Sequence, residues 1–224
     1  MKERGMIFNA EMVRALLDGR KTQTRRIIKD CTVGRDPISK FIKIGKKFIG
    51  CYPEDVPELI RECCPYGVPG DRIWVRETWA EAGASAPDLK LYRANYPEHV
   101  PSIYENVPPA EEIRWTPSIH MPRWASRILL EITDVRVERL NAISPEDAES
   151  EGLERTNFTG FGDEPGLPSY PEPDVYFDPL KKQWKEYPPE AFAGLWESIY
   201  GEGSWKANPW VWVISFKRVE GGAA

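Results

Sequence analysis

The most concentrated chemistry in this sequence lies between residues 19 and 26, which read Gly-Arg-Lys-Thr-Gln-Thr-Arg-Arg. This short segment holds four cations and two hydroxyl groups, among them Arg20. Like charges so close together repel one another, so a fold either spreads them over solvent or uses them to bind an anion. The whole chain has a formal net charge of -5, so any contact with nucleic acid must come from a local patch. We therefore expect a basic binding surface here, with Arg25 and Arg26 exposed.

A second set of residues combines arginine with tryptophan beside two expected strands. The set consists of Arg76, Glu77, Arg123, Trp124 and Arg127. Tryptophan rings stack on bases and guanidinium groups contact phosphates, so the set favours RNA binding. The same residue types also serve structural roles. Tryptophans line cores and barrel rims, and Arg26 and Arg127 can form internal ion pairs with Glu77 and Glu151. Both interpretations stay open.

Length and composition set the scale of the fold. The chain has 224 residues, of which 41% are hydrophobic, which is enough for one large or two small domains. It contains no run of about 18 apolar residues, which excludes a membrane-spanning helix. Its first residues lack the apolar stretch of a signal peptide, so we expect a cytoplasmic location.

The four cysteines, Cys31, Cys51, Cys63 and Cys64, have irregular spacing with no C-x-x-C pair. In a cytosolic protein such cysteines are reduced, and we interpret them as half-buried thiols. The alternative is a zinc site that the fold assembles from all four. We expect no metal and no cofactor.

Three helices are expected from periodicity and capping signals. Residues 9–18 carry apolar side chains at helical spacing after Asn9, which is a suitable N-cap. Residues 144–151 form a short helix with Ser144 as its cap and Asp147 completing a modified capping box. Residues 189–200 form an apolar-faced helix. These elements place the residues around Lys21 after one helix and Glu151 at the end of another.

Strands are expected over residues 71–79, 126–140 and 210–219, and more weakly over 46–52, because these segments are β-branched and aromatic or alternate in polarity. The segments 30–45, 82–112 and 155–190 look like insertions or long loops. Several strands, few helices and long irregular connections predict an α+β fold. We expect one domain over 1–224, built on a small β-barrel flanked by helices.

Four landmarks in order resemble the ASCH domain, a branch of the PUA-like β-barrel superfamily. They are G-x-K-x-x-x-x-R at 19–26, G-D-x-hydrophobic-x-V at 70–75, the acidic helix at 147–152 and the closing strand at 211–216. Each motif alone is weak, but the four share the order and spacing of the domain. The segments 64–67, 74–79 and 120–127 extend the likeness to a larger, phage- and prophage-associated type of ASCH protein in bacterial hosts.

The resemblance implies two functions for one site. ASCH domains are associated with recognition of RNA or modified nucleosides, and some small members are amidohydrolases that remove the acetyl group from acetylated cytidine. Their catalytic residues fall here on Lys21, Thr24 and Glu151. In that reaction Thr24 attacks the acetyl carbonyl, Lys21 accepts its proton and Glu151 protonates the departing amine. The broader ASCH signature often has Glu in place of Thr24, so this chain agrees with the hydrolase version.

We therefore carry three hypotheses. The first is a module for RNA or a modified nucleoside with a basic cleft around Lys21, Arg25, Arg26, Arg123 and Arg127. The second is an amidohydrolase in the same cleft, and the third is a phage protein that binds other proteins through its loops. The first two require Lys21, Thr24 and Glu151 to meet at one concave surface. Residues 21 and 24 face opposite sides of a regular strand, so we expect helical or bulged backbone there.

Overall fold

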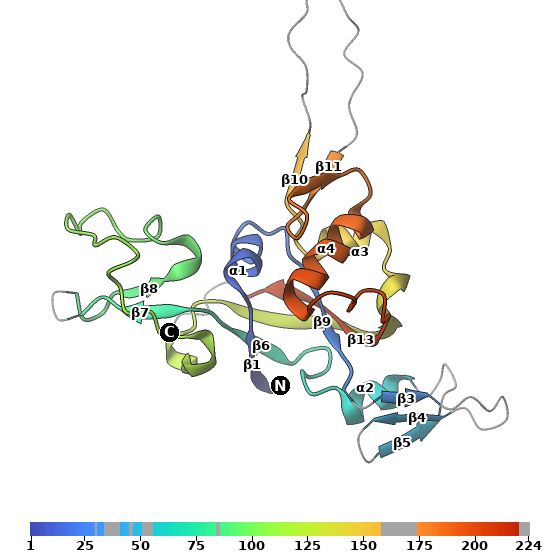
Figure 1. Cartoon of the computed structure of the whole chain (residues 1–224). Helices are drawn as coiled ribbons and strands as arrows, with labels where there is room; N and C mark the ends of the chain where they lie inside the picture. Colours follow the sequence, from blue (N-terminus) through green and yellow to red (C-terminus); the bar gives the residue numbers. More distant parts are fainter. Residues whose placement is uncertain are drawn as a thin grey trace, which may run out of the picture.

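A five-stranded mixed sheet organises this protein (Figure 1). The computed structural model describes residues 1–29, 31–33, 41–44, 47–50, 56–83, 86–157 and 174–219. The strand order is β1-β6-β9-β13-β2, and only β1 and β6 run parallel. The strands are β1 (Glu3–Ile7), β6 (Arg72–Arg76), β9 (Leu129–Arg139), β13 (Trp210–Arg218) and β2 (Gln23–Ile27). The expected mixed α+β class is confirmed.

Strand β13 is buried on both faces, which explains its nearly continuous apolar sequence. Trp212, Ile214 and Phe216 contribute to one core cluster, while Val211 and Val213 contribute to another on the opposite face. The strand pairs with β9 on one side and β2 on the other. Successive side chains of β2 therefore alternate between the two cores.

Each core is covered by helices that the sequence predicted. Helix α1 (Ala10–Leu17) begins at Asn9, whose side chain accepts a hydrogen bond from the Met12 amide, and packs on the first core. Helices α3 (Pro145–Ser150) and α4 (Pro188–Tyr200) cover the second. Figure 1 shows α3 and α4 near the β9–β13 pair. No helix in the described ranges is long and apolar enough to cross a bilayer.

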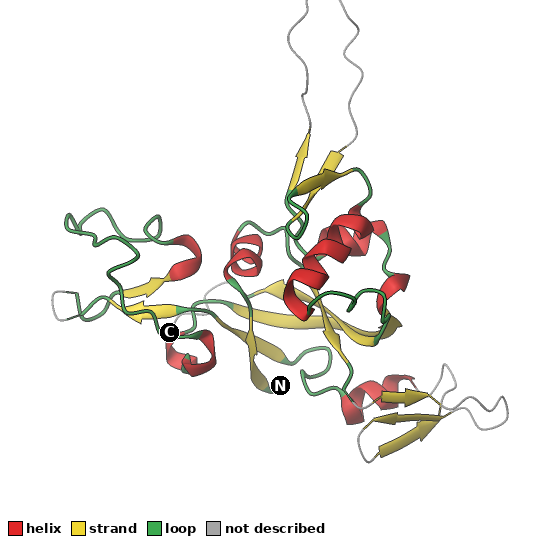
Figure 2. Cartoon of the chain, in the orientation of Figure 1, coloured by secondary structure: helices red, strands yellow, loops and turns green. Residues whose placement is uncertain are grey.

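The five-stranded sheet does not close into a barrel, so that part of the prediction was wrong. β1 and β2 are its two edges, and no ladder joins them within the described residues (Figure 2). A side chain links them instead: Arg26 of β2 donates a hydrogen bond to the Ile7 carbonyl at 2.9 Å and lies over the Phe8 ring. Among the strands that the structure describes, none pairs with the outer edge of β2.

Regular structure also occupies parts of the expected insertions. Three smaller sheets are formed by β3 (Cys31–Val33), β4 (Phe41–Ile44) and β5 (Lys47–Gly50), by β7 (Trp79–Glu81) and β8 (Lys90–Tyr92), and by β10 (Arg155–Asn157), β11 (Asp174–Asp178) and β12 (Gln183–Lys185). Helix α2 (Val56–Cys63) follows the first of these sheets. The expected strand at 71–79 is divided between β6 and β7.

Candidate functional site

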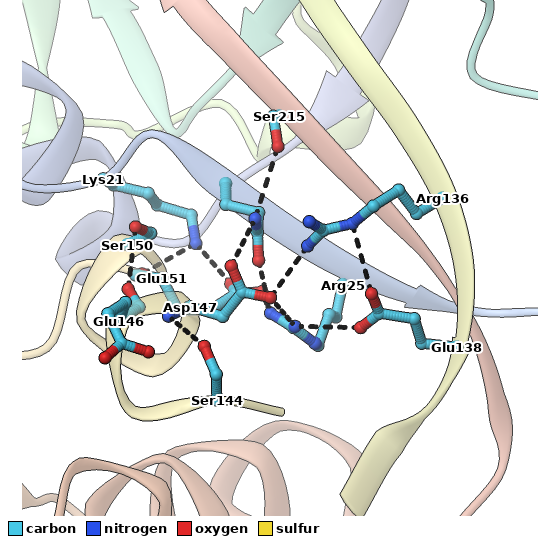
Figure 3. Close-up of polar contacts among 11 residues, drawn as sticks. Lys21, Arg25, Arg136, Glu138, Ser144, Glu146, Asp147, Ser150, Glu151 and Ser215 are labelled. Carbon is cyan, nitrogen blue, oxygen red and sulfur yellow. Dashed lines mark hydrogen bonds and ion pairs between the residues drawn. The ribbon is translucent and has the colours of Figure 1, made fainter. Parts of the chain in front are cut away.

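Lys21 and Glu151 are in direct contact although 130 residues separate them in the sequence (Figure 3). Lys21 precedes β2, and Glu151 is the C-cap residue of α3. The Lys21 Nζ donates to Glu151 Oε2 and to the Glu151 carbonyl oxygen, both at 2.8 Å. The two side chains are only 0% and 3% exposed. The structure therefore buries a charged pair at the point where the ASCH resemblance puts two functional residues.

Gly152 allows this contact. It ends α3 with a φ of 89°, a conformation that residues with a Cβ adopt at a cost. A Cβ added there would lie 2.8 Å from the Cβ atoms of both Ala15 and Lys21. The Lys21 amide donates to the Ala15 carbonyl, and the Thr22 amide donates to the Ser150 carbonyl. The end of α3 is thus held tightly between α1 and the start of β2.

Arg25 lies inside the protein, which overturns the expectation that it is exposed. Its side chain is 0% exposed, and Nη1 lies 3.2 Å from Glu151 Oε1. Its Nη2 donates to Asp147 Oδ2 at 2.8 Å. The physical reason is strand parity: Arg25 pairs with Val213, so its side chain lies on the face that α3 and α4 cover.

Asp147 links the buried contact between Arg25 and Glu151 to the surface. Its carboxylate accepts hydrogen bonds from Arg25, Gln23 and the half-exposed Arg136. The Ser144 hydroxyl caps α3 as expected, but Asp147 turns toward β2 instead of completing a capping box. The described network alternates cations and carboxylates, with Lys21, Arg25 and Arg136 against Glu138, Asp147 and Glu151 (Figure 3).

Burial lowers the pKa of the Lys21 ammonium, because removal from water disfavours its charged form. The Glu151 carboxylate acts in the opposite direction but does not outweigh burial, and the charges of Arg26 and Arg25 lower this pKa further. A lowered pKa raises the fraction of lysine that is neutral near pH 7, and only neutral lysine can accept a proton. The direction of the Lys21 shift is the one that a general base needs.

We expect the Asp147 contacts to make stability depend on acidic pH. Burial raises the pKa of the Asp147 carboxyl, but hydrogen bonds from Arg25 and Gln23 outweigh burial, so this pKa is lowered from 3.8. A carboxyl group whose pKa is lower in the folded state stabilises the fold at pH values above its unfolded-state pKa. This stabilisation is lost as the pH falls through the folded-state pKa. Asp147→Asn should lower the free energy of unfolding by about 1–3 kcal/mol at pH 7.

The measurement is urea unfolding of wild type and Asp147→Asn at several pH values from neutral to acid. The difference in the free energy of unfolding between wild type and the variant should shrink below a pH of about 4, where the wild-type carboxylate also takes up a proton. Asp88→Asn, at an exposed aspartate, is the control and should match wild type. A difference that persists unchanged into strong acid would contradict the charge-based explanation.

Thr24 and Glu151 border the same cavity. We call it the small hollow, and it lies between Met12, Thr24, Glu151 and Trp196, with a volume of about 10 Å³. The Thr24 side chain is on the face of β2 opposite Arg25, because its strand partner Ile214 belongs to the first core. The small hollow is nevertheless lined from both faces of β2, by Thr24 and by Arg25. β2 is paired without a break from Gln23 to Ile27, so the helical or bulged backbone expected between Lys21 and Thr24 does not extend into β2.

Thr24 as a residue is 1% exposed, and its side chain takes part in none of the hydrogen bonds within the described part of the chain. Its hydroxyl is not one of the fully buried side-chain atoms without a partner. Lys21 is not among the described residues that line the small hollow, but Glu151, which accepts a hydrogen bond from the Lys21 ammonium, is. The structure thus joins Lys21 to Glu151 by contact, and Glu151 to Thr24 by a shared cavity.

A second cavity adjoins the first at Glu151. This large hollow, of about 140 Å³, lies between Arg14 of α1, Glu151, Phe177 of β11 and Leu195 of α4. The two hollows share Met12, Glu151 and Leu195. Arg20 also lines the large hollow, where it donates to the Gly152 carbonyl at 2.8 Å. The sequence marked the apolar face of α4, but no pattern showed that this face would meet Glu151.

The remaining predicted residues lie elsewhere. Glu77 and Arg127 form a two-pronged ion pair at 2.9 Å, as the structural interpretation of Arg127 proposed. Arg123 pairs with Glu3. Arg76 stacks over the Trp74 ring and donates to the Ile119 carbonyl.

Trp124 is 57% exposed, and its ring meets that of Trp79 edge-on at 5.3 Å. This contact ties it to the β7–β8 end of the molecule, which Figure 1 shows well apart from α3 and α4. Neither the large hollow nor the small hollow is lined by Arg76, Glu77, Arg123 or Arg127. The structure does not bring the arginines at 123 and 127 together with Lys21 and Arg25 in one basic cleft.

The cysteines give no sign of a metal site within the described residues, which contain no cluster of three or more His, Cys, Asp or Glu side chains suited to a metal ion. Cys51 lies outside those residues. Burial raises the pKa of the Cys64 thiol, which favours the protonated form over the thiolate that metals bind.

Comparison with known proteins returned no match among family models, curated proteins or solved structures. The likeness to the ASCH domain therefore depends on the sequence landmarks themselves.

Proposed function

We propose that this chain recognises a modified nucleoside of RNA, which binds where the two hollows meet at Glu151. The observation that carries the proposal is the buried Lys21–Glu151 pair beside a cavity. Removing two charges from water costs several kcal/mol per ion before their attraction is counted. Such costly pairs gather at sites where a ligand or a reaction uses them.

The walls of the large hollow suit a nucleobase. Met12, Phe177 and Leu195 offer apolar and aromatic surface to a base, and the Glu151 carboxylate accepts hydrogen bonds from ring or exocyclic N–H groups. Arg14 and Arg20 line the same hollow as the carboxylates of Glu11, Glu151 and Glu154, and Arg20 is ion-paired with Asp18. Lys21 and Arg25 are neutralised inside the protein, so a single nucleoside fits this site better than a long phosphate track.

A PUA-like, ASCH-type organisation is part of the proposal. The order of elements supports it: α1 precedes Lys21, α3 ends at Glu151, and β13 lies between β9 and β2. The open sheet differs from a closed barrel, but the Arg26 side chain spans its two edges. The landmarks at 19–26, 147–152 and 211–216 thus lie around one site.

Calorimetric titration with N4-acetylcytidine and with cytidine tests recognition. We expect the acetylated nucleoside to bind wild type, and Glu151→Gln to weaken that binding by about 10-fold or more, because a hydrogen bond to a charged group is lost. Glu190→Gln, at an exposed glutamate in the first turn of α4, is the matched control and should bind like wild type. If neither N4-acetylcytidine nor cytidine binds to wild type, the proposal is contradicted.

Hydrolysis of an acylated nucleobase is the second candidate, and the unpartnered Thr24 hydroxyl favours it. In this reaction the Thr24 oxygen attacks the acyl carbonyl, and its proton passes by way of the Glu151 carboxylate to neutral Lys21. Glu151, in contact with Lys21, returns a proton to the amine as the C–N bond breaks. Water then hydrolyses the Thr24 ester and releases acetate. The lowered pKa of Lys21 supports the role of this residue as proton acceptor.

Chromatography of the titration mixtures tests this second candidate. We expect wild type to release cytidine and acetate. Thr24→Val should lower the rate of release by at least about 100-fold, because valine has no hydroxyl for a general base to activate. Thr24→Val keeps the shape of the side chain and should still bind the nucleoside. If wild type binds N4-acetylcytidine but releases no acetate, hydrolysis is contradicted and recognition still stands.

A further inference from the structure

Strand β1 is an edge of the five-stranded sheet, and only one side of its backbone bonds to β6 (Figure 1). The Arg72 amide donates to the Lys2 carbonyl at one end of the pair. At the other end, the Phe8 amide donates to the Arg76 carbonyl. The even-numbered residues from 2 to 8 thus face β6, because the backbone groups of successive strand residues point to alternate sides. The residues that direct their amide and carbonyl groups away from the sheet are Glu3, Gly5 and Ile7.

This outer edge of β1 is accessible to solvent. Glu3 and Gly5 are exposed, and the exposure of a glycine is that of its backbone atoms. Ile7 is 42% exposed, and its carbonyl accepts a hydrogen bond from Arg26 at 2.9 Å. The other outward amides and carbonyls of β1 have no hydrogen-bond partner in the part of the chain that the structure describes. An exposed row of unpaired backbone groups is the surface to which an extended peptide adds as a new strand.

An aromatic ring lies beside the open backbone. Gly5 pairs with Trp74 of β6, and a Cβ added to Gly5 would lie 2.6 Å from the Trp74 ring. The indole therefore extends over β1 in the direction of the open edge, across the space that Gly5 leaves. Trp74 is half-buried, so part of its ring is available to an apolar side chain of an added strand.

Cations without an ion pair among the described residues surround this edge, and they are Lys2, Arg26 and Arg76. Arg26 reaches the Ile7 carbonyl, and Arg76 is the neighbour of Ile7 in the parallel pair. The acid of β1, Glu3, is neutralised by Arg123 at 2.9 Å. The edge is therefore positively charged in a chain whose formal net charge is -5. It attracts acidic side chains, and it repels a second copy of this chain, whose edge carries the same cations.

We infer that the outer edge of β1 is a docking site for an acidic, extended segment of a partner protein, which adds to the sheet beside β1. An aromatic side chain of that segment packs on Trp74. Acidic side chains two residues before and after it lie on the same face of the added strand, near the unpaired cations. Glu3, Gly5 and Ile7 line neither hollow, so this inference does not depend on nucleoside recognition.

Fluorescence anisotropy of labelled, end-capped peptides with the full chain tests the acidic character of the partner. The acidic probe is Thr-Glu-Thr-Phe-Thr-Glu-Thr, and its control is Thr-Lys-Thr-Phe-Thr-Lys-Thr. We expect the acidic probe to bind wild type about 10-fold more tightly than the control, and added salt to reduce this difference, because exposed charges are screened. Equal affinities, or no binding of the acidic probe, would overturn the inference.

Two further probes test strand addition itself. They are the acidic peptide N-methylated at its two glutamates and the same peptide N-methylated at its two inner threonines. In an added strand only one of these alternate sets of amides faces β1. Methylation of that set should weaken binding by about 10-fold or more, because two hydrogen bonds are lost, while methylation of the other set is tolerated. Equal effects of the two methylations would contradict strand addition.

Ile7→Pro tests the edge from the side of the protein. It removes an outward N–H and leaves the bonds to β6 in place, since proline is accepted in an edge strand where its nitrogen faces solvent. Binding of the acidic probe should weaken by about 5-fold or more. Ile7→Ala keeps the N–H and should bind like wild type. If Ile7→Pro does not fold, the methylated probes with wild type still decide.

Sedimentation of wild type without peptide checks the alternative occupant. We expect a monomer. A dimer that Ile7→Pro dissociates would assign the edge of β1 to a second copy of the chain and overturn the acidic partner.

Discussion

Arg25→Met is expected to lower the free energy of unfolding by about 3–5 kcal/mol, which is the usual cost of removing one partner from a buried ion pair. The change leaves Glu151 Oε1 without its cation and takes from Asp147 its closest buried donor. Methionine fills much of the same space, so packing accounts for little of the loss. Urea unfolding followed by circular dichroism gives the measurement.

The matched control is Arg26→Met, at the next residue of the same strand. The Arg26 guanidinium donates to a backbone carbonyl and lies over the Phe8 ring, and no ion pair of Arg26 occurs in the described part of the chain. Its loss should cost about 0.5–1.5 kcal/mol. Equal losses for the two variants would show that the buried carboxylates do not depend on Arg25.

Gly152→Ala is expected to have the second large effect, on stability and on ligand binding together. The left-handed backbone costs an alanine about 1–2 kcal/mol, and the crowding against Ala15 and Lys21 adds about 1–3 kcal/mol. To relieve the crowding, α3 must move from β2 and carry the Glu151 carboxylate with it. Urea unfolding and titration with N4-acetylcytidine should therefore both show a loss.

Gly201→Ala separates the cost of the backbone conformation from the cost of crowding. Gly201 has a φ of 92°, close to the 89° of Gly152, but no atom lies within 4 Å of the position that its Cβ would take. Gly201 has a ψ of 164°, a backbone conformation that is essentially confined to glycine, so this variant should lose only the backbone contribution of about 1–3 kcal/mol and bind ligand like wild type. Similar results for both alanine variants would contradict the close approach of α3 to β2 as the cause.

Local signals predicted the elements that carry the site. Helices α1 and α3 begin beside the expected caps, Asn9 and Ser144, because a cap depends on residues within one turn. Strands β9 and β13 were predicted from their β-branched and aromatic residues. The edge strands β1 and β2 were missed, since their short, charged sequences lack the alternation of a strand with one face in an apolar core.

The sequence by itself determined that a lysine follows α1, that an acidic helix ends at Glu151, and that four cations are packed into residues 19–26, because these properties depend on neighbours in the chain. Only the tertiary structure decided that Arg25 is internal, since its burial depends on the register of β2 with β13. It also decided which acids neutralise that charge: Glu151 lies 126 residues away and meets Arg25 because α3 docks on β2 through Gly152. No local pattern encodes such a contact, because its energy comes from surfaces that meet only when the chain has folded.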